Sequence, residues 1–325
     1  MAIEHPRPET DEIVAHLAAL GGAGAVVVDL PGEAPKAAVG VVRIGVHRSG
    51  PLPAESLAAF DILLSADTDA PRPWVGTARL NEVLRDLTQA IARQPVAAGI
   101  AAQVMRMTHA LPFDHALALE SLAFSMLLAS AGFRTWREAA APRPRSDGDR
   151  PRVRIVSEGP TLIIRLARQA RRNAFDARMR DELCEALTFA LDHPDRPPVV
   201  LVGEGPAFSA GGDLDEFGEA GDMGSAHLIR TLRSPAALVN ALGTRLTAHL
   251  HGACIGAGIE VAASAARITA RPTTVIRLPE VSMGLIPGAG GTAAIPRRIG
   301  RERACFLAIS GAELKLATAL AWGLV

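Results

Sequence analysis

Apolar and polar positions in the second half of the chain follow two periods, which predicts strands alternating with helices. Short apolar and β-branched runs predict strands at 153–156, 161–166, 199–202, 248–250 and 267–270. Helical spacing predicts a helix at 176–191, and a run of small residues predicts another at 259–265. Glu158-Gly159-Pro160, between the first two strands, is typical of a hairpin turn. This alternation favours an α/β fold with a largely parallel sheet.

The first half of the chain changes from strands to helices near residue 77. Strands are predicted at 25–30, 41–46 and 61–64, with turns rich in Pro and Gly between them. Amphipathic or apolar helices are predicted at 80–91, 97–109 and 116–130. The last of these is so apolar that we expect it to be buried against another part of the protein or another subunit.

Residues 141–151 are rich in Pro, Gly and charge and lack apolar periodicity, which predicts an exposed linker. We therefore divide the chain into a small α/β or irregular segment at 1–76, a helical region at 77–140, this linker, and a core at 152–325.

Composition excludes several function classes. The 325 residues are 49% hydrophobic and carry no net charge, so long-range attraction favours neither nucleic acid nor a membrane as partner. The three cysteines are isolated and lack metal-ligand spacing, which favours a reducing compartment. The amino terminus has acid and proline where a signal peptide needs a basic start and an apolar run. We expect a cytoplasmic protein.

Two glycine-lined turns are the first candidate chemistry. One, at 206–214, leads from a strand toward a helix, and the other, Gly256-Ala257-Gly258, precedes the helix at 259–265. Small residues let backbone N–H groups approach a ligand, and two such groups aimed at one point can hold an oxyanion. Each turn alone is equally well explained by tight packing. Together they favour enolate or acyl chemistry on an activated carbonyl.

Two glutamates accompany these turns. Glu260 lies in the first turn of a predicted helix, where a dipole contact would also explain it. Glu280 follows Pro279 in a loop flanked by apolar residues, so enclosure would raise its pKa and suit it to hold a proton. Taken alone, a glutamate at this place is better explained as a solvated surface residue.

Other polar groups are weaker candidates. His249 and His251 fit a metal pair only with further ligands that the sequence does not offer, so we predict turn or buried histidines and no metal. The Gly-rich run at 288–292 lacks the Lys of a phosphate loop, which excludes a nucleoside triphosphate site. Asp215, Glu216 and Asp222 are predicted to lie on a solvated face.

In their order along the chain, four segments resemble the crotonase superfamily, the enoyl-CoA hydratase and isomerase family. They are 171–175, 207–213, 251–260 and 278–292, and the resemblance covers about 152–325. It implies a ClpP/crotonase-like spiral core of repeated ββα units. It also implies that the N–H groups of Gly212 and Ala257 hold the oxyanion of a 2-enoyl-CoA thioester, and that coenzyme A enters only as part of the substrate, with no other cofactor.

The resemblance assigns Glu260 to the water and Glu280 to the α-proton, so the pair favours water addition by an enoyl-CoA hydratase. An enoyl-CoA isomerase, an acyl-CoA thioester hydrolase and a non-catalytic assembly homologue are the alternatives. The guanidinium groups at 171–172 suit CoA phosphates, although an exposed basic turn explains them equally well. The residues assigned to CoA or substrate binding are Arg171, Arg172, Asn173, Ala174, Phe175, Ala210, Gly211, Asp213 and Gly256.

The chain departs from the family at its end. A typical relative continues past Val325 with helices that build a trimer contact and part of the acyl pocket, and residues 80–136 resemble those helices. We therefore expect a permutation-like arrangement in which the trimerisation-type helices come first and pack against the end of the core. A homotrimer or a dimer of trimers is the implied assembly.

Overall fold

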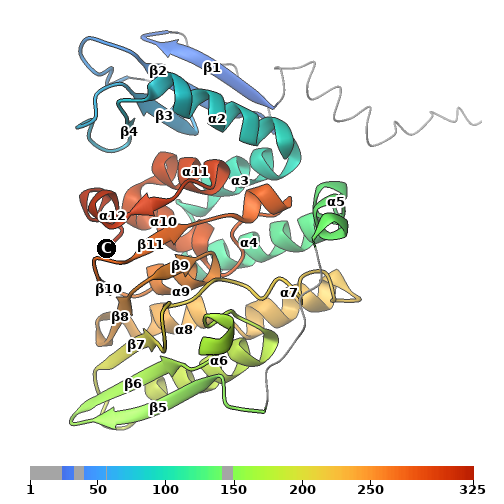
Figure 1. Ribbon diagram of the computed structural model, residues 1–325, viewed down its shortest axis with the longest axis vertical. Coiled ribbons are helices and arrows are strands. Elements are labelled where there is room, and N and C mark those ends of the chain that lie inside the picture. The colour runs from blue at the N-terminus through green and yellow to red at the C-terminus, as the bar shows by residue number, and fades with distance from the viewer. Residues whose placement is uncertain (1–23, 33–39, 56, 141–148) are drawn as a thin grey trace, which may run out of the picture.

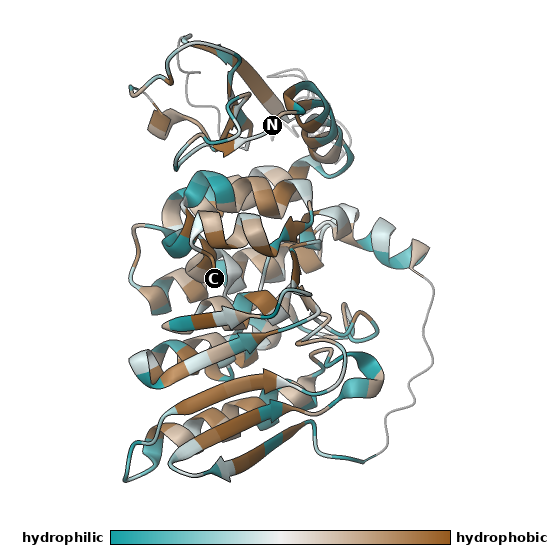
Figure 2. Ribbon diagram, turned by 60° about the vertical axis from the view of Figure 1, so that its left-hand side comes forward, coloured by the Kyte–Doolittle hydropathy of each residue, from teal (hydrophilic) through white to brown (hydrophobic). Residues whose placement is uncertain are grey.

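The computed structural model describes residues 24–32, 40–55, 57–140 and 149–325. The molecule is elongated, with an amino-terminal sheet at one end, a larger sheet at the other, and layers of helices between them (Figure 1). The strands of both sheets are largely apolar (Figure 2), in keeping with the runs that predict them.

The larger sheet has the order β10-β8-β7-β6-β5 and is parallel except for the hairpin of β5 and β6. Both the parallel sheet and the hairpin are therefore confirmed. A second sheet has the order β12-β11-β9. The strands are β5 (Val153–Glu158), β6 (Thr161–Leu166), β7 (Val199–Gly203), β8 (Leu246–Leu250), β9 (Ala253–Ile255), β10 (Arg267–Ala270), β11 (Val275–Arg277) and β12 (Leu314–Lys315).

The core contains helices α6 (Ala177–Asp192), α7 (Met223–Leu232), α8 (Pro235–Leu242), α9 (Ala257–Ala263), the 3-10 turn η4 (Glu280–Met283), α10 (Gly291–Ile299), α11 (Arg301–Ser310) and α12 (Leu316–Trp322). Helices α6 and α9 and the turn η4 each follow a pair of strands, as in ββα units, whereas α7 and α8 follow the single strand β7. Helix α9 begins two residues before the predicted 259–265, because Gly256 at φ +46° turns the chain directly into it. This start places the N–H of Ala257 at the open end of the helix.

The amino-terminal sheet is parallel and has the order β1-β2-β3-β4. Its strands are β1 (Ala25–Leu30), β2 (Val42–His47), β3 (Ile62–Ser65) and β4 (Val75–Gly76), so the three predicted strands are present. Strand β4 was not predicted, because its two residues are too few to show an alternation of apolar and polar positions. Positions 1–23, 33–39 and 56, and 141–148 of the predicted linker, lie outside the described residues. The limits at 1–76, 77–140, 141–151 and 152–325 stay predictions.

Four helices follow this sheet: α2 (Leu80–Arg93), α3 (Pro95–Thr108), α4 (Phe113–Leu128) and α5 (Ala131–Ala139). The apolar helix α4 packs against α3, α7 and α10, and α2 and α3 pack against α11. The expected burial of α4 is met only in part within one chain, because Leu122 is 54% exposed and Met126 is 56% exposed. These helices lie against the last long helices of the core, but their correspondence to the family's carboxy-terminal helices stays a prediction.

Within the described ranges, no single helix is both long and apolar enough to cross a bilayer. Helices α4 and α5 reach that length and composition only when taken together, and they bend by 64° at their junction. The cytoplasmic location stays a prediction from the sequence.

A buried carboxylate joins the amino-terminal sheet to the helices. The side chain of Asp61, just before β3, is fully buried, and Arg106 of α3 donates two hydrogen bonds to it at 2.6 and 2.5 Å. Arg43 lies 3.4 Å away and Arg301 of α11 lies 3.6 Å away. Against the effect of burial, the hydrogen bonds and charge of Arg106 and Arg43, including the backbone N–H of Arg43, hold the pKa of Asp61 below its usual range. The carboxylate thus ties β3 to both α3 and α11.

We predict that Asp61→Asn lowers the free energy of unfolding by about 3 kcal/mol, because it leaves a partly buried Arg cluster without its anion. The exposed pair of Asp29 and Arg48, at 2.8 Å, offers a matched control, and Asp29→Asn should cost less than about 1 kcal/mol. Urea unfolding of both variants measures the difference. Equal losses in the two variants would show that Asp61 has no such role.

Candidate active site

A cavity of about 480 Å³ opens between α4, α7, α8 and the start of α9. Gly212, Ala257, Glu260 and Glu280 all line it. The structure therefore brings together the four residues to which the sequence assigns catalysis. They come from two turns, the first turn of α9, and η4.

The two glycine-lined turns lie side by side. Ser209 bridges Cys254, with its N–H donated to the carbonyl of Ala253 at 3.1 Å and its carbonyl accepting from Ile255 at 3.0 Å. Beyond these bonds the first turn reaches Gly212 and the second reaches Ala257. Neither the N–H of Gly212 nor that of Ala257 has an acceptor within the described part of the chain. Two backbone donors therefore remain for a ligand oxygen.

The two glutamates are held in different ways. Glu260 is 1% exposed, and its Oε2 accepts the N–H groups of Ala289 at 2.7 Å and Gly291 at 3.0 Å. Glu280 is 6% exposed, and its Oε2 has no hydrogen-bond partner among the described residues. Their Oε1 atoms both lie around Gly256, where a Cβ would lie 2.3 Å from that of Glu280 and 3.9 Å from that of Glu260.

Burial sets the charge of both groups. It raises the pKa of Glu280 to about 8. It also raises the pKa of Glu260 well above its usual range, aided by the charges of Glu280 and Glu120, while the amides of Ala289 and Gly291 act in the opposite direction. With a pKa near 8, the carboxyl of Glu280 keeps its proton at neutral pH. The two amide donors on Glu260 offset the effect of burial on its pKa only in part.

Glu120 of α4 is a third glutamate in the cavity, and the sequence analysis missed it. It is 2% exposed and accepts the N–H groups of Gly290 at 2.7 Å and Thr292 at 2.8 Å, and the Thr292 hydroxyl at 2.7 Å. Burial raises its pKa to about 7. It is the only charged residue in the apolar run 116–130, and a charge in a buried helix requires a partner. That signal would have found it.

The predicted CoA-binding residues divide into two groups. Phe175 and Asp213 line the cavity, whereas the remaining seven do not. Asn173 is fully buried, and its amide donates to the carbonyls of Glu204 at 2.8 Å, Ala207 at 2.9 Å and Phe208 at 3.2 Å. It thus fixes the loop that enters the first turn. The residues that do not line the cavity are Arg171, Arg172, Asn173, Ala174, Ala210, Gly211 and Gly256.

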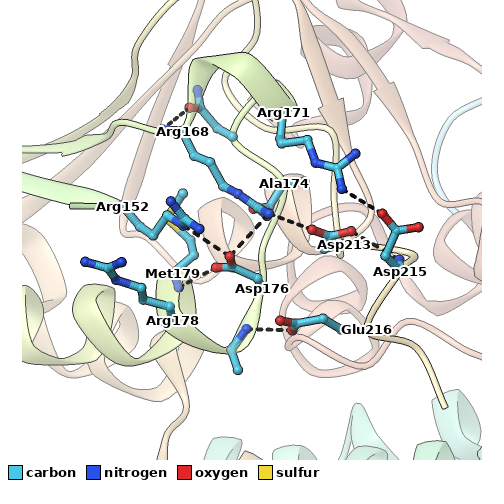
Figure 3. A network of polar contacts seen from close by, with 12 residues as sticks. Arg152, Arg168, Arg171, Ala174, Asp176, Arg178, Met179, Asp213, Asp215 and Glu216 are labelled. Carbon is cyan, nitrogen blue, oxygen red and sulfur yellow. Dashed lines mark hydrogen bonds and ion pairs between the residues drawn. The ribbon is translucent and has the colours of Figure 1, made fainter. Parts of the chain in front are cut away.

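An ion-pair network fixes the loop after Gly212 (Figure 3). Arg168 donates to Asp213 at 2.7 Å, and Arg171 donates to Asp215 at 2.6 Å. The prediction that Asp215 lies on a solvated face is wrong, because this residue is 8% exposed and paired. Glu216 accepts the N–H of Ala177, and Asp222 is the exposed N-cap of α7.

Residues 158–325, about half of the chain, match the family model described as enoyl-CoA hydratase/isomerase. The chain belongs to this family. It is 33% identical to an enoyl-CoA hydratase from Thermoplasma volcanium, covering 54% of this chain and 71% of that one with a TM-score of 0.50. An enoyl-CoA hydratase subunit from Geobacillus kaustophilus is 31% identical, covering 54% of this chain and 67% of that one, with the same TM-score. The crotonase-type α/β fold is confirmed.

We predict that the buried glutamates make the protein less stable as pH rises from about 5 to 8. Their folded-state pKa values lie above the unfolded values, so the folded chain binds more protons and releases them in this window, at up to about 1.4 kcal/mol per pH unit for each group. Urea unfolding across that range measures the slope. Glu280→Gln should flatten it and exposed Glu138→Gln should not. An unchanged slope in Glu280→Gln would contradict this account.

Proposed function

We propose that this member of the family is an enoyl-CoA hydratase, which adds water across the double bond of a 2-enoyl-CoA thioester. The observation that carries the proposal is the pair of buried glutamates, Glu260 and Glu280, in one cavity with two backbone N–H groups that have no acceptor. Water addition needs one group to take a proton from water and another to give one to carbon. The pair supplies both.

The thioester carbonyl fits between the N–H groups of Gly212 and Ala257. Attack at the β-carbon moves an electron pair through the conjugated system onto this oxygen and produces an enolate. The two donors stabilise that charge as it develops, and the dipole of α9 adds to their effect because Ala257 is its first residue.

The proton transfers then balance. Glu260, as the anion, takes one proton from water while the hydroxyl oxygen bonds to the β-carbon. Glu280 gives its proton to the α-carbon as the enolate collapses to the thioester. The product is a 3-hydroxyacyl-CoA, and the proton gained by Glu260 must return to Glu280 before the next cycle. Both carboxyl groups face the same cavity at Gly256, so water in the cavity can carry that proton.

Several features stay predictions beside this proposal. One of these is the contact of Arg171 and Arg172 with CoA phosphates. Arg171 already donates a hydrogen bond to Asp215, so a CoA phosphate would have to share this guanidinium with Asp215 or replace it. The homotrimer or dimer of trimers is implied only by the resemblance. An isomerase would shift the double bond without consuming water, and a thioester hydrolase would release free CoA.

We predict that Glu260→Gln and Glu280→Gln each slow the hydration of crotonyl-CoA by about 10²- to 10⁴-fold, because each removes one proton-transfer group. Loss of the enoyl absorbance follows water addition, and a thiol reagent detects any released CoA. Exposed Glu138→Gln is the matched control and should keep the full rate. Hydration at the wild-type rate in both active-site variants would sink the hydratase assignment.

A second substitution tests the oxyanion donors. Ala257 is the first residue of α9, a position that tolerates proline, so Ala257→Pro deletes one N–H with little change to the helix. We predict a drop in kcat of about 10²- to 10³-fold. Ala257→Gly keeps the N–H and should stay close to wild type. If the two variants hydrate crotonyl-CoA equally fast, this N–H holds no oxyanion.

A further inference from the structure

Several charged side chains that line the cavity have no part in the proposed reaction, and one of them is a partly buried arginine. Arg230, near the end of α7, lines the same cavity as Glu260 and Glu280. We propose that Arg230 binds a carboxylate at the far end of the acyl group, so that the substrate is the CoA thioester of a dicarboxylic acid. This inference rests on the proposed function and names the substrate class of that site.

The guanidinium is fixed by contacts from α4. Its Nε donates to the hydroxyl of Ser121 at 3.2 Å, and Nη2 donates to the hydroxyl of Ser125. Its central carbon lies 4.9 Å from the centre of the Phe124 ring, within the range of a cation–π contact. Ser121 is fixed in turn, because its hydroxyl lies 3.0 Å from Nδ1 of His227. Arg230 therefore has a defined position before any ligand binds.

The same guanidinium lacks an anion. Among the described residues no carboxylate lies within 4.0 Å of it, and Nη1 donates no hydrogen bond. Glu120 is the nearby acid, but its two oxygens already accept three hydrogen bonds from Gly290 and Thr292. Burial lowers the pKa of Arg230 to about 10, and the charge of Glu120 offsets this only in part.

The surroundings favour a charged ligand group over a neutral one. Leu117, Phe124 and Phe217 give the cavity apolar walls on which an acyl chain can pack. A neutral chain that filled the cavity would remove water from the guanidinium of Arg230 without supplying a hydrogen bond or an anion in its place. A carboxylate at the end of the chain would restore an anion and accept from the two N–H groups of Nη1. The predicted ligand is thus apolar along its chain and anionic at its end.

The test compares non-reacting saturated thioesters by calorimetry. Glutaryl-CoA and adipyl-CoA carry the terminal carboxylate, and valeryl-CoA and hexanoyl-CoA are the neutral thioesters of the same lengths. We expect one of the dicarboxylic thioesters to bind the wild-type protein about 10- to 100-fold more tightly than its neutral partner, as for a hydrogen-bonded charge pair. The CoA phosphates are common to both ligands, so the ratio reports only the acyl carboxylate.

Arg230→Met should abolish this ratio, and Arg230→Lys should keep part of it. Arg233→Met is the matched control, because Arg233 also lines the cavity but is exposed, and it should keep the full ratio. A ratio near one in the wild type, or a full ratio in Arg230→Met, would overturn the inference, as would failure of all four thioesters to bind. Because no ligand reacts, loss of the hydratase assignment alone would leave this measurement valid.

Discussion

The site depends on four consecutive backbone amides at 289–292. The N–H groups of Ala289 and Gly291 are donated to Glu260, and those of Gly290 and Thr292 are donated to Glu120. The backbone of this short loop is thus hydrogen-bonded to two carboxyl groups, with alternate amides donating to each. Because the same amides orient Glu260, the position of its carboxyl group depends on that of the loop. Glu120 comes from α4, so a helix from the first half of the chain forms part of the cavity wall.

Three buried glutamates, Glu120, Glu260 and Glu280, line one cavity and impose a second constraint. In a low-dielectric site such groups cannot all ionise near neutral pH, and burial raises the pKa of each. Hydrogen bonds offset this effect in part for two of the three groups. Glu120 and Glu260 accept several donors, whereas one oxygen of Glu280 accepts none among the described residues. The three carboxyl groups therefore differ in how they are held, although all three share one cavity.

Local patterns predicted the parts of the fold that local forces determine. The strands at 161–166 and 267–270 lie where the β-branched runs place them, and the apolar run at 116–130 lies in helix α4 and the turn after it. Strands of two or three residues, such as β9 and β12, are too short to show a period and are held by their neighbours. Asp215 and Glu120 were misjudged or missed because their partners, Arg171 and the amides of Gly290 and Thr292, are distant in sequence.

A large distance in sequence is nevertheless a small obstacle to such a contact, so a helix from the first half of the chain can complete the site. The bond between Glu120 and Gly290 spans 170 residues, whereas that between Glu260 and Ala289 spans 29. Because the entropy of loop closure grows only with the logarithm of length, the longer span costs about 1.6 kcal/mol more. Three hydrogen bonds that satisfy buried donors contribute about 0.5–1.5 kcal/mol each, and leaving those donors unpaired would cost more. Chain order is therefore a weak constraint here, and the pairing of buried polar groups is a strong one.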